Sequence, residues 1–520
     1  MTKRKAVWTR RRCGHIDRRA GGSEGGDFPL FMGNSGVFNI IFHEGPFLCY
    51  IYGMTTMLIK NGLVVTERDE AVRDVLVSGQ TIAEIGEAGE SLVPADTDAA
   101  VIDAAGKIVI PGGIDAHTHL GLDVGFTAAS DDFFTGTVAA AHGGVTAIVD
   151  HPAFGPTGCP LDHQIEQYHR LAAGNAVIDY GFHGVIQHVD DAVLDAMPSL
   201  AAAGITSYKV YLTYDYKIED GGLYRILEKA GKENLLITVH PENDGVITHL
   251  RRTLLAAGKT SPRYHPVSRP PECEAEAVGR MILIARMTGD APLYIVHLTN
   301  RLGLDFIRIA RKRGQRNLYA ETCPQYLLLD QSRYKLPGDE GLKYIMCPPL
   351  RTIADQKALW AGLARGDIHV IATDHCPFFF ATQKKRGSND FTRTPSGAPG
   401  IEERMALIYS EGVVKNRLTL RQFVDLTSAN PAKLFGLYPK KGVLRKGSDA
   451  DIVILDPQAR TVLSAKDIHS NVDYTAYEGF AVTGRPVTTI SRGEVIVQDG
   501  VFKGAKGRGR FLKREKRSAL

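Results

Sequence analysis

The chain has 520 residues, enough for about three ordinary domains or for a barrel with a smaller partner domain. Hydrophobic residues make up 44% of it and charged residues 23%, which excludes a disordered or fibrous chain. The net charge of +4 is too small to indicate a nucleic-acid partner, and no apolar stretch is long enough to indicate a membrane span.

The two chain ends differ from the middle. Residues 1–56 begin with a cluster of lysines and arginines and continue through a glycine-rich and an aperiodic apolar segment. We expect an unstructured extension, for which a start-site artefact is a better explanation than a targeting peptide. The folded chain is expected to begin at Met57, and residues 501–520 are expected to form a solvated basic tail.

Short strand patterns occupy both flanks of the folded part. Residues 57–110 and 436–500 each contain several short β-branched runs separated by turn residues. Neither segment is long enough to bury a core of its own. We therefore expect the two segments to pair into one small β-sandwich domain built from both chain ends.

Residues 111–435 follow another pattern. Continuous apolar runs of about four to eight residues recur there, and each is followed by a helical stretch. Fully apolar strands that alternate with helices are typical of a parallel sheet covered by helices. We count eight such runs, which predicts an α/β fold with a (β/α)8 TIM-like barrel.

Metal-ligand residues follow the predicted strands. His117 and His119 close the first strand, and side chains two residues apart share one face of a strand, so both imidazoles can bind one divalent ion. This pair alone is a weak signal, because histidines making ordinary hydrogen bonds have the same spacing. However, His240, His297 and Asp374 also follow apolar runs, where an unpartnered polar group is costly. The set predicts a metal site at the barrel mouth.

Lys209 points from the fourth predicted strand toward the same cluster. An ammonium group beside metal ions would be repelled. One interpretation is that Lys209 pairs with a carboxylate elsewhere. The other is that the buried neutral amine reacts with CO2, so that an anionic carbamate bridges two metal ions.

The order and strand placement of these six residues resemble those in the cyclic amidohydrolases of the amidohydrolase superfamily. The six are His117, His119, Lys209, His240, His297 and Asp374. Four segments resemble its hydantoinase and dihydropyrimidinase group: residues 131–137, 240–243, 321–326 and 373–376. The resemblance spans about residues 57–515 and leaves the first 56 residues unmatched.

The resemblance implies a site with two divalent ions, expected to be zinc, and a homotetramer. The implied ligands are His117, His119, Lys209 as a carbamate, His240, His297 and Asp374. The seven scattered cysteines are odd in number and include no C-x-x-C pair, which makes disulfides unexpected and predicts a cytoplasmic location.

Three further roles are implied for a small cyclic amide substrate. Tyr214 falls on the position that stabilises the oxyanion. Cys347 and Ser396 fall on positions that hold the substrate amide, where the family usually has Ser and Asn. Those family contacts use the backbone, so the substitutions need not abolish binding.

The implied reaction is hydrolysis of the ring amide. A water whose pKa the metal site lowers attacks the ring carbonyl, and Asp374 transfers its proton to the departing ring nitrogen. The expected product is an N-carbamoyl amino acid. The expected substrates are 5-substituted hydantoins of D configuration. Leu122, Phe126 and Tyr216 are predicted to form an apolar wall for a 5-aryl group, unless they merely pack the loops.

Other activities remain open within the resemblance. Dihydroorotases have an arginine where this chain has Gly121, which favours a neutral ring. Dihydropyrimidinase and allantoinase activities are alternatives, since ring size leaves no sequence mark. A non-enzymatic scaffold related to dihydropyrimidinases is disfavoured because all six ligand positions are intact.

Overall fold

A computed structural model describes residues 56–94, 97–518 and 520, and all statements below refer to these ranges. The predictions for residues 1–55 lie outside them. Within these ranges, none of the helices combines the length and the apolar character that crossing a bilayer requires. The five cysteines described are free thiols: Cys159, Cys273, Cys323, Cys347 and Cys376.

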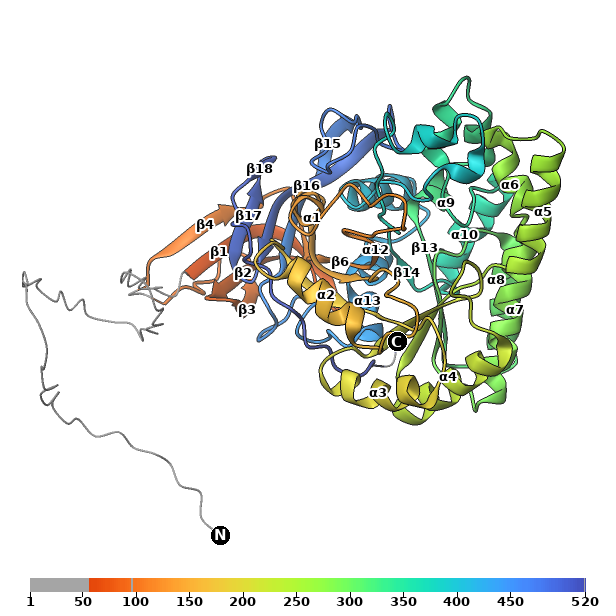
Figure 1. Cartoon of the computed structure of the whole chain (residues 1–520). Coiled ribbons are helices and arrows are strands. Elements are labelled where there is room, and N and C mark those ends of the chain that lie inside the picture. Colours follow the sequence, from red (N-terminus) through yellow and green to blue (C-terminus); the bar gives the residue numbers. More distant parts are fainter. Residues whose placement is uncertain (1–55, 95–96, 519) are drawn as a thin grey trace, which may run out of the picture. The chain divides into compact units, whose positions relative to one another are not determined.

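Strands from both ends of the chain build one β domain (Figure 1). The N-terminal strands are β1 (Thr56–Val65), β2 (Glu70–Ser78), β3 (Thr81–Glu87), β4 (Ala99–Asp103) and β5 (Ile108–Pro111). The C-terminal strands are β15 (Ile452–Val462), β16 (Ala481–Ser491), β17 (Glu494–Gln498) and β18 (Val501–Phe502). They form a nine-stranded sheet in the order β18-β17-β16-β15-β5-β1-β2-β3, with β4 also paired to β1.

Two strand pairings explain how this domain closes around a core. β15 lies antiparallel to β5, which joins the two chain ends. β4 pairs with the first half of β1 and β5 with its second half, on either side of an irregularity between Ile59 and Gly62. The sheet therefore forks at this point, and its buried residues from both ends, such as Val75 and Ile452, share one hydrophobic cluster.

The middle of the chain forms the barrel. Its parallel strands are β6 (Gly113–Thr118), β7 (Val145–Asp150), β8 (Asp179–Phe182), β9 (Gly184–Val185), β10 (Ser207–Tyr211), β11 (Leu236–His240), β12 (Leu293–Ile295), β13 (Leu318–Thr322) and β14 (Val370–Ile371). The third barrel strand is interrupted at His183, which separates β8 from β9. A bridge between Thr118 and His375 brings the last strand back to the first. The fold class predicted from the sequence is confirmed.

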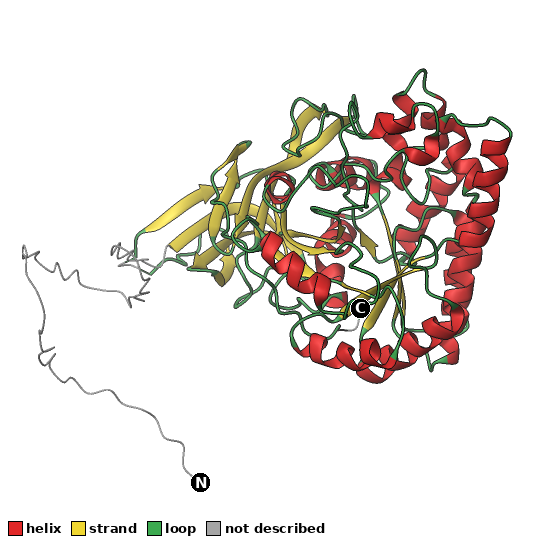
Figure 2. Cartoon of the chain, in the orientation of Figure 1, coloured by secondary structure: helices red, strands yellow, loops and turns green. Residues whose placement is uncertain are grey.

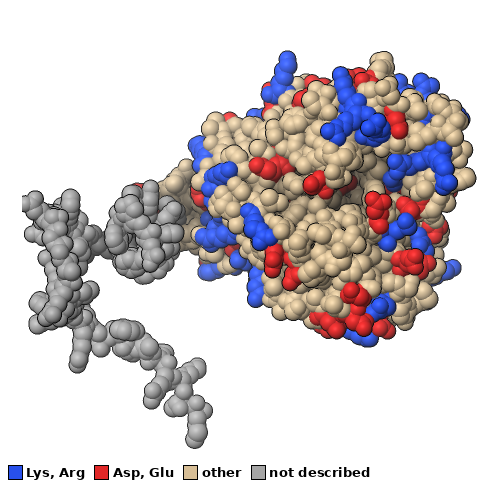
Figure 3. All heavy atoms as spheres, viewed as in Figure 1, with Lys and Arg blue, Asp and Glu red and all other residues tan. Residues whose placement is uncertain are grey.

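Helices cover the outside of the barrel strands (Figure 2). They are α1 (Thr135–His142), α2 (His163–Ala172), α3 (Asp191–Ala202), α4 (Asp220–Glu233), α5 (Asp244–Ala256), α6 (His265–Ser268), α7 (Pro271–Met287), α8 (Arg301–Lys312), α9 (Pro324–Leu328), α10 (Ile353–Arg365), α11 (Arg404–Ile408), α12 (Leu420–Val424) and α13 (Asn430–Leu434). Short 3₁₀ or π turns span Pro262–Tyr264, Gln331–Lys335, Glu340–Tyr344, Lys384–Gly387, Phe391–Arg393, Tyr409–Val414 and Asp425–Ala429. Basic and acidic side chains are interspersed over the face that Figure 3 shows.

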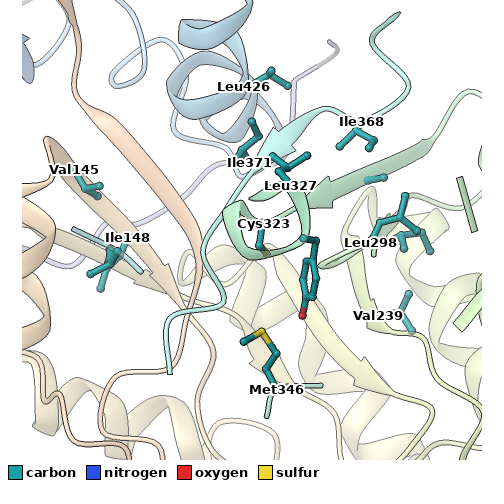
Figure 4. Close-up of a cluster of buried hydrophobic side chains, with 14 of the residues drawn as sticks. Val145, Ile148, Val239, Leu298, Cys323, Leu327, Met346, Ile368, Ile371 and Leu426 are labelled. Atoms are coloured by element: carbon teal, nitrogen blue, oxygen red, sulfur yellow. The ribbon is translucent and has the colours of Figure 1, made fainter. Parts of the chain in front are cut away.

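Successive side chains along a barrel strand belong alternately to two hydrophobic clusters, one between the strands and the helices and one among the strands themselves. Ile148, Val239 and Ile371 belong to the cluster between strands and helices, part of which Figure 4 shows. Ala147 and Val149, which flank Ile148 on β7, belong instead to a smaller cluster with residues of the other barrel strands. This alternation is what fully buried parallel strands require.

Part of the basic tail is packed against the barrel, so the expectation of a solvated tail is wrong for Arg514, although Lys503, Lys506 and Lys516 are exposed as expected. Arg514 is buried, and its guanidinium donates to the Ser207 hydroxyl at 3.0 Å and to the Phe182 carbonyl at 2.5 Å. Leu512 belongs to the same cluster as Val149. Arginine reaches into such a site because its long apolar stem packs while its guanidinium satisfies backbone carbonyls.

Candidate metal centre

The predicted ligands meet at the carboxyl ends of the barrel strands, and one group surrounds Asp374. The Nε2 atoms of His117 and His119 lie 3.2 Å and 3.1 Å from Oδ1 of Asp374. β6 ends at Thr118, between the two histidines, and Asp374 follows β14 by three residues. Two imidazoles and one carboxylate therefore point at a common position.

The second group consists of His240 and His297. His240 is the last residue of β11, and its Nδ1 atom lies 2.9 Å from Nε2 of His297, two residues beyond β12. Two nitrogens bound to one zinc ion, each at about 2.0–2.1 Å, lie about 3 Å apart. The two facing nitrogens are thus placed as ligands of a single ion would be.

Lys209 lies in the middle of β10 and is 1% exposed. Within the described ranges its Nζ atom makes no ion pair, and it lies 5.2 Å from the centre of the Tyr211 ring. Burial lowers the pKa of this amine to about 8, although Asp374 and Glu321 oppose the shift. About a tenth of this amine is therefore neutral at pH 7, far more than for an ordinary lysine, and the neutral amine is the form that reacts with CO2.

Two buried carboxylates fix the orientation of His117 and His240 by binding the ring nitrogen that points away from the centre. Glu321 binds Nδ1 of His117 and accepts hydrogen bonds from the Tyr294 hydroxyl at 2.8 Å and the His297 backbone NH at 3.0 Å. Glu242 lies 2.8 Å from Nε2 of His240. In both rings the other nitrogen is left facing the centre, which is how histidine ligands of metals are commonly fixed.

Arg269 completes the support behind His240. Its guanidinium donates to Glu242 at 2.5 Å and lies 5.7 Å from the centre of the Tyr214 ring. Burial alone would raise the pKa of Glu242, but Arg269 and His240 lower it to about 2, so this carboxylate stays ionised.

The donor set fits divalent metal ions of the zinc type. Nε2 of His117 is buried and makes no well-oriented hydrogen bond with the described residues, although Oδ1 of Asp374 lies 3.2 Å away. Burial would lower the pKa of this ring, but Glu321 and Asp374 raise it to about 9. The position is therefore one that a cation stabilises, and imidazole with carboxylate is the donor chemistry that zinc prefers.

One histidine at the centre was not predicted. A ligand atom of His151 lies within 4.8 Å of those of His117 and His119, and neither of its ring nitrogens has a hydrogen-bond partner in the described chain. The ring stacks on His183 with centres 4.0 Å apart. The sequence signal was present, because His151 directly follows β7 as His117 and His119 flank the end of β6.

Tyr214 lies beside this centre in the loop after β10. Its ring centre is 5.2 Å from that of His240, and its backbone φ of 72° lies in the left-handed region. His297 and Asp374 also have positive φ values, and such strained residues cluster at functional sites. Burial raises the pKa of the Tyr214 hydroxyl well above its ordinary value, so the group remains a hydrogen-bond donor.

The centre opens into a cavity of about 640 Å³, a size typical of small-molecule sites. Cys347 and Ser396 line it, with Sγ and Oγ 3.3 Å apart. Lys384 was not predicted here, but its buried amine donates to the carbonyls of Ile345 at 2.7 Å, Pro395 at 2.9 Å and Gly397. Lys384 therefore holds together the two backbone segments that carry Cys347 and Ser396.

Aromatic side chains form another part of the cavity lining. Leu122, Phe126 and Tyr216 all line it, together with Phe154, which the sequence did not single out. The Phe154 ring lies 4.6 Å from that of Tyr216 and 4.9 Å from that of Tyr211. The predicted apolar residues thus face the same space as the metal-ligand residues.

A barrel that gathers imidazole, carboxylate and amine groups at the carboxyl ends of its strands is the arrangement of a metal-dependent hydrolase. Comparison with known proteins defines the family. The model of the amidohydrolase family matches residues 108–496, and the chain belongs to this family.

Individual relatives agree with the resemblance to the hydantoinase and dihydropyrimidinase group, which is confirmed. The chain is 50% identical over 459 residues to a D-phenylhydantoinase of Escherichia coli O1:K1 / APEC, covering 88% of this chain and 98% of that protein. The crystal structure of a dihydropyrimidinase from Brevibacillus agri NCHU1002 has a TM-score of 0.87 at 44% identity, covering 90% and 100% of the two chains. A D-hydantoinase from a Bacillus sp. AR9 has a TM-score of 0.85 at 45% identity, covering 88% and 99%.

Proposed function

We propose that this enzyme hydrolyses the ring amide of 5-substituted hydantoins, preferring 5-aryl rings of D configuration, and releases N-carbamoyl amino acids. The observation that carries the proposal is one cavity lined both by the clustered metal-ligand residues and by Leu122, Phe126, Phe154 and Tyr216. The similarity to a D-phenylhydantoinase supports the same reaction and substituent.

Two divalent ions, expected to be zinc, are the proposed cofactors. His117, His119 and Asp374 would hold one, and His240 and His297 the other. When bound, such ions polarise a carbonyl and lower the pKa of a water molecule. Lys209 lies among both groups and is proposed to bridge them as a carbamate. Its neutral amine would form an N–C bond with CO2 and release one proton.

Two side chains are proposed to act on the reacting atoms. The Tyr214 hydroxyl would donate to the oxygen that becomes negative when the ring carbonyl is attacked. Asp374 would accept a proton from the attacking water and pass it to the departing ring nitrogen. Burial opposes ionisation of Asp374, but His117 and His119 hold its pKa well below the ordinary value, so the carboxylate begins the reaction without a proton.

The backbone at Cys347 and Ser396 is proposed to hold the amide edge of the ring. Both segments are fixed by Lys384 through their carbonyl groups, and the Gly397 backbone NH donates to the Ile345 carbonyl at 3.1 Å. Because this support comes from the backbone and from Lys384, the cysteine and the serine need not be the residues that relatives usually have.

Dihydropyrimidinase activity is the second candidate, since the dihydropyrimidinase from Brevibacillus agri has a similar structure. A six-membered dihydropyrimidine ring without a substituent would leave the aromatic lining uncovered. Rates on 5-phenylhydantoin, hydantoin, dihydrouracil and allantoin distinguish the candidates, and turnover of none of them by metal-loaded protein would favour a scaffold role.

A homotetramer is the proposed assembly. An exposed apolar face covers α7 and α8, formed by Leu283, Met287, Leu302, Phe306 and Ile309, each between 44% and 64% exposed. The three residues of α8 follow at spacings of four and three and so share one side of that helix. Contiguous apolar surface of this kind commonly marks a protein interface.

A further inference from the structure

A second group of metal-ligand side chains lies outside the catalytic cavity. It consists of His142, the last residue of α1, Glu402, which precedes α11, and His469, in the connection between β15 and β16. One candidate ligand atom from each residue lies within 4.8 Å of the other two. α1 runs from the carboxyl end of β6 back toward the start of β7, so His142 lies away from the catalytic histidines.

The contacts within this group leave one ring nitrogen without a partner. Glu402 accepts from the backbone NH of His469 at 2.7 Å with one oxygen and lies 2.8 Å from Nδ1 of the same residue with the other. The two imidazole rings stack with centres 3.4 Å apart and planes 7° from parallel. Nε2 of His142 is buried and has no hydrogen-bond partner in the described part of the chain.

The electrostatics of the group favour a cation. Nε2 of His142 is buried without a hydrogen-bond partner among the described residues, so its lone pair is available when the ring is neutral. Glu402 supplies a negative charge beside both rings. The carbonyl groups at the C-terminal end of α1 add a partial negative potential at His142.

We propose that His142, Glu402 and His469 form a further divalent-cation site, separate from the catalytic centre. Two imidazoles and one carboxylate are the ligand set of many zinc sites with a water in the fourth position. The His469 side chain is 40% exposed, so an ion reaches the site directly from solvent. The lone pairs of the two nearly parallel rings do not converge, so the exposed His469 ring would turn as the ion displaces the proton that it shares with Glu402. Nε2 of His142 would be the third ligand.

An ion at this site would join three separate segments. The β15–β16 connection that carries His469 also carries Asn471, whose backbone NH donates to Asp131 at 2.8 Å. Asp131 in turn lies 3.0 Å from Nε2 of His375, the residue after Asp374. The site would therefore stabilise a segment that supports the end of the last barrel strand, and ligand binding of this kind raises the unfolding temperature.

Zinc titration of the holoenzyme, with its catalytic centre already loaded, tests the proposal by calorimetry and by thermal unfolding. We expect the wild-type enzyme to bind one additional ion per subunit and its Tm to rise by at least about 3 °C. His142→Ala and His469→Gln should lose the additional ion and the rise in Tm. The matched control, His249→Ala, removes an exposed histidine of α5 and should keep both.

A conservative variant guards against misfolding as the cause. Glu402→Gln keeps the size of the side chain and removes its charge, so it should fold and bind the additional ion at least tenfold more weakly. An additional ion that binds equally to the wild type, His142→Ala and Glu402→Gln would overturn the proposal, as would its absence from the wild type. These experiments measure zinc binding and Tm and not the turnover of hydantoin. Either result therefore leaves the proposed catalytic function to be tested separately.

Discussion

Nδ1 of His240 and Nε2 of His297 face each other at 2.9 Å, although the residues come from different strands. Glu242 fixes the His240 ring through Nε2, whereas at His297 the backbone NH donates to Glu321 and Nδ1 of the ring has no partner among the described residues. Lys209 lies on β10, next to the strand that carries His240. A carbamate at Lys209, as proposed, would therefore lie beside the ligand group that contains His240.

Lys209→Ala should abolish measurable turnover, because no anionic bridge would remain between the two ligand groups. A short carboxylic acid supplied with metal should restore part of the activity by replacing the missing carboxylate. Lys232→Ala, which removes a mostly exposed lysine, should have no effect. The modification itself can be observed by carbon NMR after incubation with labelled bicarbonate, and an unmodified Lys209 in a metal-loaded crystal would contradict it.

Tyr214→Phe should lower kcat by about 10²–10³-fold with little change in KM, because the oxyanion loses one donor that acts mainly in the transition state. Steady-state kinetics on a hydantoin measure both constants. Tyr216→Phe is the matched control, since it keeps the ring that lines the cavity and should retain nearly full kcat. A Tyr214→Phe enzyme with wild-type kcat would exclude this role.

His265 should make folding stability sensitive to acid. Burial, and then the neighbouring Arg269, lower its pKa to about 3 in the folded protein, against about 6.5 when unfolded. Between these values the unfolded chain binds more protons, so stability is lost as the pH falls below 6.5. The loss attributable to this group approaches about 1.4 kcal/mol per pH unit.

Urea unfolding at pH 7, 6 and 5 measures this effect in wild type and His265→Gln. The variant should lose less free energy of unfolding than the wild type over that range, by about 1–2 kcal/mol. His249→Gln, an exposed histidine substitution, should follow the wild type. Identical pH dependence in all three proteins would contradict a neutral buried His265.

The apolar face of α7 and α8 should control assembly. Phe306→Arg places a charge in its middle and should convert the proposed tetramer into smaller species. Val101→Arg, at an even more exposed apolar residue of β4, should leave assembly unchanged. Light scattering at micromolar concentration measures the mass, and a monomeric wild-type protein would contradict the assembly.

The barrel and the positions of the six proposed ligands could be predicted because their signals are local. A buried parallel strand appears in the sequence as a short apolar run. A polar residue directly after such a run is predicted to lie at the carboxyl end of the barrel, where active sites form. His240 and Lys209 lie within strands, and His297 and Asp374 lie two and three residues beyond theirs, all near the predicted ends.

The supporting residues could not be predicted because their partners are distant in sequence. Glu321 binds a histidine 204 residues away, and Lys384 binds carbonyl groups on two different segments. Neither has a spacing that marks its role. Arg514 was misread for the same reason, since a basic run on a terminus normally indicates solvation, and only the packed fold offers it the Phe182 carbonyl and the Ser207 hydroxyl.

The ratio of kcat/KM for D-5-phenylhydantoin to that for dihydrouracil tests the proposed function most directly. An aryl group against Phe126, Phe154 and Tyr216 would bury apolar surface at about 25 cal/mol per Å² and gain ring contacts of about 0.5–1.5 kcal/mol. We predict that this ratio is at least about 10, equivalent to about 1.4 kcal/mol. Phe126→Ala should lower the ratio, because it should reduce kcat/KM for the aryl substrate alone. Equal kcat/KM values on both substrates in the wild-type enzyme would contradict the account and favour a dihydropyrimidinase.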